Sequence, residues 1–137
     1  MKDTTAQGDI AEWQIVAALV RRGRKVLRPV SSASRYDVAI DNLDGTMTRV
    51  QCKMGRLRDG RIEFRLYSMS GHQGTRGRAY AGEVDAFGVY CPATRQSYLV
   101  PVSAIAGRTG SACLRVSPAR NGQRTGIRGA AEFAIGS

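Results

Sequence analysis

The stretch RVQCKMG, residues 49–55, decides how this sequence can fold and where its chemistry can lie. The segment predicts a β-strand, in which successive side chains point to opposite faces of a sheet. Gln51 and Lys53 therefore share one face, while Val50 and Cys52 turn to the other. The strand thus places an amide and an ammonium group side by side on one surface.

The composition is that of an ordinary globular chain. It has 137 residues, 42% hydrophobic and 23% charged, which fits one compact domain and argues against general disorder. We find no apolar run that could form a membrane helix and no hydrophobic segment of a signal peptide in MKDTTAQGD, so we expect a cytoplasmic protein. The 3 cysteines show neither CxxC pairing nor metal-ligand spacing, which argues against a zinc site or a disulfide framework.

The chain is strongly basic. Its 21 Lys and Arg residues against 11 Asp and Glu residues give a formal charge of +10, spread along the whole sequence. This balance favours an anionic partner, most often nucleic acid. A basic surface without a specific partner is the alternative.

Hydrophobic periodicity predicts one helix followed by several strands. The helix is expected at residues 8–22, GDIAEWQIVAALVRR, with Asp9 near its start and Gly23 at its end. Strands are expected at residues 25–30, 36–40, 46–53, 61–67, 86–91 and 96–102, with one short extended piece at 113–116. We expect the strand at 61–67 to pair with the strand at 46–53.

Glycine-rich segments mark the connections. The sequence DNLDG, residues 41–45, predicts a turn between two of the strands. Residues 68–82 are rich in Gly, Ser and Arg and predict a mobile loop. We expect the core to span about residues 8–102 and residues 107–137 to form a basic, glycine-rich extension of the same domain.

Two carboxylates fall where apolar side chains are expected. Glu12 lies within a wide apolar arc of the predicted helix, made of Ile10, Trp13, Ile15, Val16, Ala17, Leu19 and Val20. Asp37 lies in a predicted strand, where aspartate is a poor strand former. A buried carboxylate needs a metal, a cation or a proton. The structural alternatives are an ion pair of Glu12 with Arg35 or Arg49, a frayed helix end, or a salt-bridged Asp37.

These polar groups can converge. If the strand of Asp37 lies beside the strand of Gln51 and Lys53, the three side chains share one face. We expect the predicted helix to pack over that face and to bring Glu12 to them. The convergence of four polar groups favours a functional site.

The order of these residues resembles the PD-(D/E)XK nuclease superfamily. It is most similar to the small stand-alone endonucleases in which Gln replaces the second acidic residue, a branch that includes intron-encoded homing endonucleases. The resemblance covers roughly residues 8–102, through RYDVAI, VQCKMGRLRDGRIEFR, YAGEVDAFGVYCP and YLVPV, with a weaker match at NGQRTGIR. This sequence departs from the pattern because no proline precedes Asp37 and because Gln51 is neutral.

The resemblance implies an α/β fold with a restriction-endonuclease-like core, in which a mixed β-sheet is flanked by the N-terminal helix. It implies a metal-dependent DNA endonuclease that hydrolyses phosphodiester bonds, with Glu12, Asp37, Gln51 and Lys53 as catalytic residues. Mg²⁺, or Mn²⁺ as a substitute, would be held by Asp37, the Gln51 amide oxygen and the backbone carbonyl of Cys52, with Glu12 bound through water or to a second ion. Lys53 would orient the attacking water and offset charge on the phosphate.

The expected partner is double-stranded or branched DNA. The candidate DNA-contacting residues flank the site and are Arg35, Arg56, Arg58, Arg61, Arg76 and Arg78. A chain with one site must associate to cut both strands, so we expect a homodimer or homotetramer. The favoured interpretation is a site-specific homing endonuclease. A Holliday-junction resolvase of the same fold and a DNA-binding protein that has lost cleavage are the alternatives.

Overall fold

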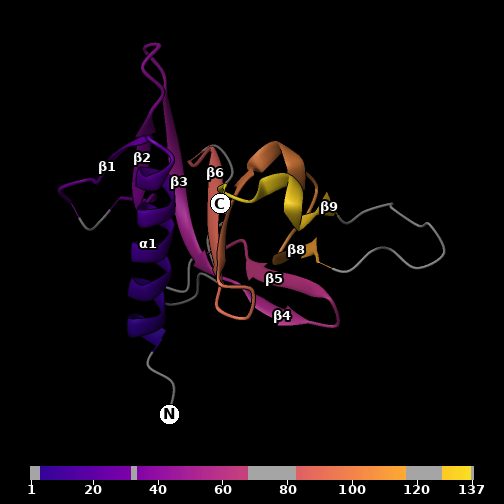
Figure 1. Ribbon diagram of the computed structural model, residues 1–137. Coiled ribbons are helices and arrows are strands. Elements are labelled where there is room, and N and C mark those ends of the chain that lie inside the picture. The colour runs from indigo at the N-terminus through magenta and orange to yellow at the C-terminus, as the bar shows by residue number, and fades with distance from the viewer. Residues whose placement is uncertain (1–3, 32–33, 68–82, 117–127, 137) are drawn as a thin grey trace.

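The structure, a computed structural model, describes four segments of the chain: residues 4–31, 34–67, 83–116 and 128–136 (Figure 1). The first element is helix α1 (Thr4–Arg21), which ends in a Schellman motif. Gly23 takes a left-handed φ of 79°, and the N–H groups of Gly23 and Arg24 donate to the carbonyls of Val20 and Leu19 at 2.9 and 3.0 Å. The predicted end of the helix is confirmed, because glycine adopts this conformation without strain.

Helix α1 begins earlier than residue 8, the predicted start. Asp9 therefore lies inside the helix, and the first turn contains no acidic residue. The prediction took Gly8 as a boundary, but a Cβ added at Gly8 would meet nothing within 4 Å. A single glycine inside a helix costs only about 1 kcal/mol, which the packing of the remaining helix offsets.

The buried stripe of α1 is narrower than predicted. Ala11, Ile15 and Leu19 are buried against the sheet. Three large apolar residues of the predicted arc are instead exposed: Ile10 at 49%, Trp13 at 59% and Val20 at 55%. A helix on a single sheet contacts it along one line with a spacing of four residues, so the wider arc lies outside the contact.

Helix α1 covers one face of a five-stranded mixed sheet with the order β1-β2-β3-β6-β7 (Figure 1). The strands are β1 (Lys25–Leu27), β2 (Val38–Asp41), β3 (Met47–Met54), β6 (Ala86–Cys91) and β7 (Gln96–Pro101). The pair β3 and β6 is parallel, and the other pairs are antiparallel. All five strands were predicted, with ends that differ by at most three residues.

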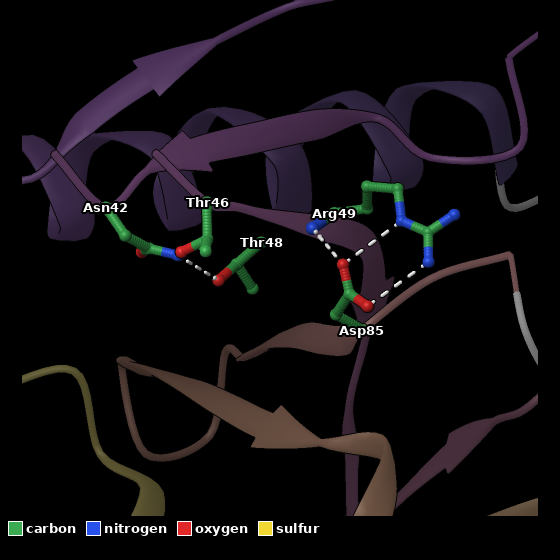
Figure 2. A network of polar contacts seen from close by, with 5 residues as sticks. All are labelled: Asn42, Thr46, Thr48, Arg49 and Asp85. Carbon is green, nitrogen blue, oxygen red and sulfur yellow. Dashed lines mark hydrogen bonds and ion pairs between the residues drawn. The ribbon is translucent and has the colours of Figure 1, made fainter. Parts of the chain in front are cut away.

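The predicted turn at residues 41–45 joins β2 to β3. The Asn42 side-chain amide donates hydrogen bonds to the hydroxyls of Thr46 and Thr48, each at 3.0 Å (Figure 2). These contacts help to hold the hairpin in the register that places Val38 opposite Val50. The register matters for the site, because it brings the residue before Val38 next to the middle of β3.

An ion pair helps to hold β3 and β6 together at the start of their parallel pairing. Asp85 accepts hydrogen bonds from the backbone N–H of Arg49 at 2.8 Å and from its guanidinium at 3.1 and 3.2 Å (Figure 2). Parallel neighbours cannot be joined by a tight turn, so a side-chain contact of this kind supports their register. Arg49 is therefore engaged within the fold.

The chain also forms a second mixed sheet, which has four strands in the order β4-β5-β8-β9. Its strands are β4 (Arg56–Arg58), β5 (Arg61–Arg65), β8 (Ser111–Arg115) and β9 (Arg128–Gly129). The predicted pairing of the strand at 61–67 with the strand at 46–53 was wrong, because β5 pairs with β4 and β8. A hairpin turn at Asp59 and Gly60, with φ of 52° and 74°, favours the local partner β4.

Apolar clusters lie on both faces of the first sheet. The cluster under α1 consists of Ala11, Ile15, Leu19, Val38, Ile40 and Val50. The opposite cluster joins β6 and β7 to the second sheet and includes Ile62, Phe64, Phe87 and Leu114.

The opposite cluster also contains residues from the end of the chain. Ala112 and Leu114 of β8 are buried in it, together with Ala130 of the 3₁₀ helix η3 (Ala130–Phe133). A second 3₁₀ helix, η1 (Val102–Ile105), contributes Ile105. Buried residues therefore also occur beyond residue 102, within the expected C-terminal extension.

Several predicted features lie outside the described residues. They are the mobile loop at 68–82 and, within it, the candidate DNA-contacting residues Arg76 and Arg78. In the part of the chain that the structure describes, no helix combines the length and the apolar character needed to cross a membrane.

Candidate active site

Asp37 stands just before β2, beside the middle of β3. Its backbone N–H donates to the carbonyl of Val50 at 2.9 Å, and its carboxylate Oδ2 accepts a hydrogen bond from the N–H of Cys52 at 2.8 Å. Because β2 has not yet begun at this position, the Asp37 carboxylate takes the place of a backbone carbonyl as the acceptor for the Cys52 N–H. Burial raises the pKa of Asp37, opposed in part by the Cys52 N–H and the charge of Lys53.

Cys52 presents its backbone to Asp37. The N–H and C=O groups of one strand residue point toward the same neighbouring strand, so the Cys52 carbonyl lies on the Asp37 side of β3. The side chain packs against the cluster under α1. Burial raises the pKa of the thiol well above its usual value, so the sulfur stays protonated and acts as a small apolar group.

Lys53 projects from the other face of β3. Its Nζ donates a hydrogen bond to the backbone carbonyl of Tyr67 at 2.8 Å. Burial lowers the pKa of the amine to about 8, although the charge of Asp37 acts in the opposite direction. An amine with this pKa changes charge close to neutral pH.

Glu12 approaches the site from α1. Its carboxylate forms an ion pair with Arg28, whose guanidinium lies 5.0 Å from the centre of the Trp13 ring. Burial raises the pKa of Glu12, and the negative charge of Asp37 raises it further. The two carboxylates are therefore close enough to repel each other.

The ion-pair partner of Glu12 is not one of the two arginines suggested by the sequence. Arg35 forms an ion pair with Glu83 at 2.6 Å, and Arg49 forms one with Asp85 at 3.1 Å. The contact of Glu12 with Arg28 joins residues separated by 16 positions in the sequence. It arises from the packing of α1 beside β1, which no periodic pattern in the sequence reveals.

The prediction that α1 packs over the face of Gln51 and Lys53 was wrong. The helix lies on the opposite face, where a Cβ added to Gly88 of β6 would come within 2.8 Å of Ile15 Cγ2 and 3.2 Å of Val50 Cγ1. The apolar face of β2 and β3 attracts the helix, because burial of apolar area drives packing. Glu12 reaches the site from the helix side, and the charges of Glu12 and Lys53 both lie within electrostatic range of Asp37.

Gln51 is the remaining residue of the predicted site. It lies directly opposite Phe87 of β6 and projects, by strand alternation, from the same face as Lys53. Its side chain is half-buried, and among the described residues its amide has no hydrogen-bond partner. The amide oxygen is thus available as a neutral ligand.

The comparisons with known proteins agree with this geometry. The family model described as PD-(D/E)XK endonuclease matches residues 2–135. The chain belongs to the PD-(D/E)XK endonuclease family. Its resemblance to this family, inferred from the sequence, is confirmed, as is the α/β fold with an N-terminal helix.

Among solved structures, the chain is similar to the bacterial homing endonuclease I-Ssp6803I. Its structure matches with a TM-score of 0.68 and 22% sequence identity, over 98% of this chain and 88% of that chain. At this identity the likeness shows the shared fold. A search of curated proteins finds no match.

The side chains of this PD-(D/E)XK endonuclease fit an oxygen-binding divalent cation. Among the described residues, no three His, Cys, Asp or Glu side chains form a group that could hold a metal ion by themselves. The donors around the strand edge are oxygens, from Glu12, Asp37, the Gln51 amide and the Cys52 carbonyl. Burial raises the pKa values of the Glu12 and Asp37 carboxyls, the charge of Asp37 raises that of Glu12 further, and a divalent cation bound between them would offset the repulsion.

The predicted DNA-contacting arginines fall into different environments. Arg56 and Arg58 on β4 and Arg61 on β5 are exposed. Arg35 is partly buried and held by Glu83. Two further residues near the site were missed by sequence reasoning, Arg28 and Arg65, since both read as ordinary surface charges.

Proposed function

We propose that this PD-(D/E)XK endonuclease is a metal-dependent enzyme that hydrolyses phosphodiester bonds in DNA at a specific site. The observation that supports the proposal best is the arrangement around Cys52. Its N–H binds the Asp37 carboxylate at 2.8 Å, and the next side chain along β3 is the half-buried amine of Lys53. This arrangement brings an acidic ligand, a carbonyl and a cation to one strand edge.

Each residue has a role that follows from its position. Asp37, the Gln51 amide and the Cys52 carbonyl would hold Mg²⁺ or Mn²⁺, and Glu12 would join them directly or through water. The bound ion would polarise a phosphate oxygen and lower the pKa of a water ligand. Lys53 would hold the attacking water and, when protonated, offset charge on the phosphate.

Arg28 would control the charge of the site. It neutralises Glu12 in the structure, so the carboxylate has a counter-cation before a metal arrives. A divalent ion must compete with this guanidinium for Glu12. Trp13 holds the guanidinium by cation–π contact, which keeps Arg28 beside the site when Glu12 is released.

DNA is the substrate that the family and the charge support. The chain carries a net charge of +10, and a homing endonuclease is similar to it in structure. One chain supplies one site, so cleavage of both strands requires a homo-oligomer, either a dimer or a tetramer. Site-specific cleavage of double-stranded DNA is therefore proposed over cleavage of branched DNA.

Cleavage of a supercoiled plasmid tests the proposal. The wild-type protein should nick and linearise the plasmid in Mg²⁺ but not in EDTA, and Lys53→Ala should bind DNA without cutting. A four-way junction of matched sequence serves as a second substrate. Preferred cutting of the junction would replace the homing interpretation with a resolvase. DNA binding without cleavage, in Mg²⁺ and in Mn²⁺, would show a binding protein that has lost catalysis.

A further inference from the structure

The outer face of the second sheet carries an unusual set of charges. By alternation, Ile62, Phe64 and Leu114 point to the core, so their neighbours in β4, β5 and β8 point to solvent. The outward residues include five arginines and one acidic residue, Glu63. The arginines are Arg56, Arg58, Arg61, Arg65 and Arg115.

Three of these arginines lie in one row across three strands. Arg61 is directly opposite Arg58 on one side and Arg115 on the other. Like charges placed directly opposite each other on adjacent strands destabilise a sheet. A row of three guanidinium groups is therefore kept at a cost in stability.

The outward arginines lack acidic partners. Within the segments that the structure describes, the ion pairs involve other basic residues, and none joins any of these five arginines. The Nε atom of Arg115 is buried and has no hydrogen-bond partner. A buried unsatisfied N–H costs about 1–3 kcal/mol, a second penalty carried by the same row.

The position of this face relative to the candidate active site is fixed by the backbone. Gly55 alone separates β3, which carries Lys53, from β4. A Cβ at Gly55 would approach Ile62 Cγ2 to 2.7 Å and Val89 Cγ1 to 2.8 Å, so the two sheets are in close contact at this point. The hairpin of β4 and β5 therefore begins directly after β3, the strand that carries Lys53 (Figure 1).

At the other end of β5, Arg65 lies two residues beyond Glu63, which is directly opposite Arg56 at the start of β4. Arg61 lies four residues away along the strand, about 13 Å from Arg65. The arginines thus extend outward from the candidate active site.

We propose that the outer face of the β4 and β5 hairpin, with Arg115 beside it, enters the major groove of the DNA next to the cleaved phosphate. This inference rests on the proposed function. A two-stranded ribbon fits the major groove, which is about 12 Å wide, and arginine pairs there with the O6 and N7 atoms of guanine. Glu63, between Arg56 and Cys113, is an acceptor suited to the N4 amino group of cytosine.

The test uses two labelled duplexes of the same mixed sequence, one of which carries a glucosyl group on each cytosine and so has an obstructed major groove. Binding is measured by fluorescence anisotropy in Ca²⁺. The wild-type protein should bind the unmodified duplex about tenfold or more tightly than the modified one. The double variant Arg58→Gln/Arg61→Gln should lose this preference, and Arg21→Gln, on α1 across the first sheet, should keep it.

Stability supplies an independent readout. The loss of like-charge repulsion should leave the thermal midpoint of Arg61→Gln unchanged or raised, although DNA binding weakens. A purely structural role of Arg61 would lower the midpoint instead. Equal binding of both duplexes by the wild type would overturn the inference while plasmid cleavage still supports the proposed function. A wild-type protein that neither binds nor cuts DNA would overturn both.

Discussion

The Asp37 carboxylate accepts a hydrogen bond from the backbone N–H of Cys52 at 2.8 Å. This contact gives one side chain two duties. Oδ2 accepts the hydrogen bond of β3 where β2 has not begun, and in the proposed site the other oxygen binds the metal ion. The substitutions used to test Asp37 must therefore distinguish its hydrogen bond to β3 from its proposed role in catalysis.

Replacement of Asp37 by Asn should abolish cleavage and stabilise the protein. The amide oxygen can still accept the Cys52 N–H, but the charge that binds the metal is lost. Because burial raises the folded-state pKa of Asp37, its stabilising contribution is present at low pH and is lost as pH rises through that pKa. Asp37→Asn should thus be more stable than wild type at neutral pH in EDTA, with the difference shrinking in acid, as measured by urea denaturation.

Two controls separate the duties of Asp37. Asp37→Ala leaves the Cys52 N–H without its acceptor and should be about 1–3 kcal/mol less stable than Asp37→Asn. Asp44→Asn changes an exposed aspartate whose pKa is lowered by hydrogen bonds from Thr46, so it should give no gain in stability at neutral pH. Cleavage by Asp37→Asn at the wild-type rate would remove Asp37 from the metal site.

The pH dependence of stability should reveal Lys53. Its amine has a folded-state pKa of about 8 against an ordinary value of 10.5, so between these values the unfolded chain binds more protons than the folded one. Stability should therefore rise with pH across this window, by about 3 kcal/mol at most. Lys53→Met should be more stable than wild type at pH 7 in EDTA, and the difference should vanish above the window.

The measurement is the free energy of unfolding of both proteins at a series of pH values, with Ca²⁺ and Mg²⁺ absent. Parallel curves for wild type and Lys53→Met would mean that the amine is not desolvated. Circular dichroism shows whether the variant keeps its fold. Loss of plasmid cleavage by the folded variant then reports the catalytic role of Lys53 alone.

Strand alternation alone predicts that Asp37, Gln51 and Lys53 share one face, because the side-chain period of a strand is two. It could not say which face the helix covers, since both faces of β3 bury side chains. The second sheet was missed for a related reason. Ala112 and Leu114 alternate with polar residues in a short glycine-rich stretch, and their burial depends on β5, which is distant in sequence.

The ion pair of Glu12 with Arg28 shows the same limit. The sequence indicated that Glu12 needs a cation, but the partner depends on how α1 lies beside β1. Trp13 was interpreted as a core residue, whereas it is 59% exposed and carries the guanidinium on its ring. The local sequence pattern thus predicts that Glu12 needs a compensating charge, but the three-dimensional structure is needed to identify the residue that supplies it.

Removal of Arg28 should strengthen metal binding. In Arg28→Gln the Glu12 carboxylate loses its ion-pair partner. A divalent ion then no longer competes with a guanidinium for this carboxylate, so the affinity of the protein for the ion should rise several-fold. Titration calorimetry with Mn²⁺, without DNA, measures this directly. The matched control Arg21→Gln removes an equal charge from the end of α1 and should leave the affinity unchanged. A fall in affinity for Arg28→Gln alone would show that Arg28 orients Glu12 for the metal rather than competing with it.

The packing of α1 on β6 should set the position of Glu12. A Cβ added at Gly88 lies 2.8 Å from Cγ2 of Ile15, a branched and fully buried side chain, so Gly88→Ala must push α1 outward. Overpacking of this kind costs about 1–3 kcal/mol, seen in urea denaturation, and the displaced Glu12 should slow cleavage at temperatures where the variant is folded. Gly8→Ala, at an open position of the same helix, should instead gain up to about 1 kcal/mol and cut normally. Normal cleavage by a destabilised Gly88→Ala would show that Glu12 acts without close positioning.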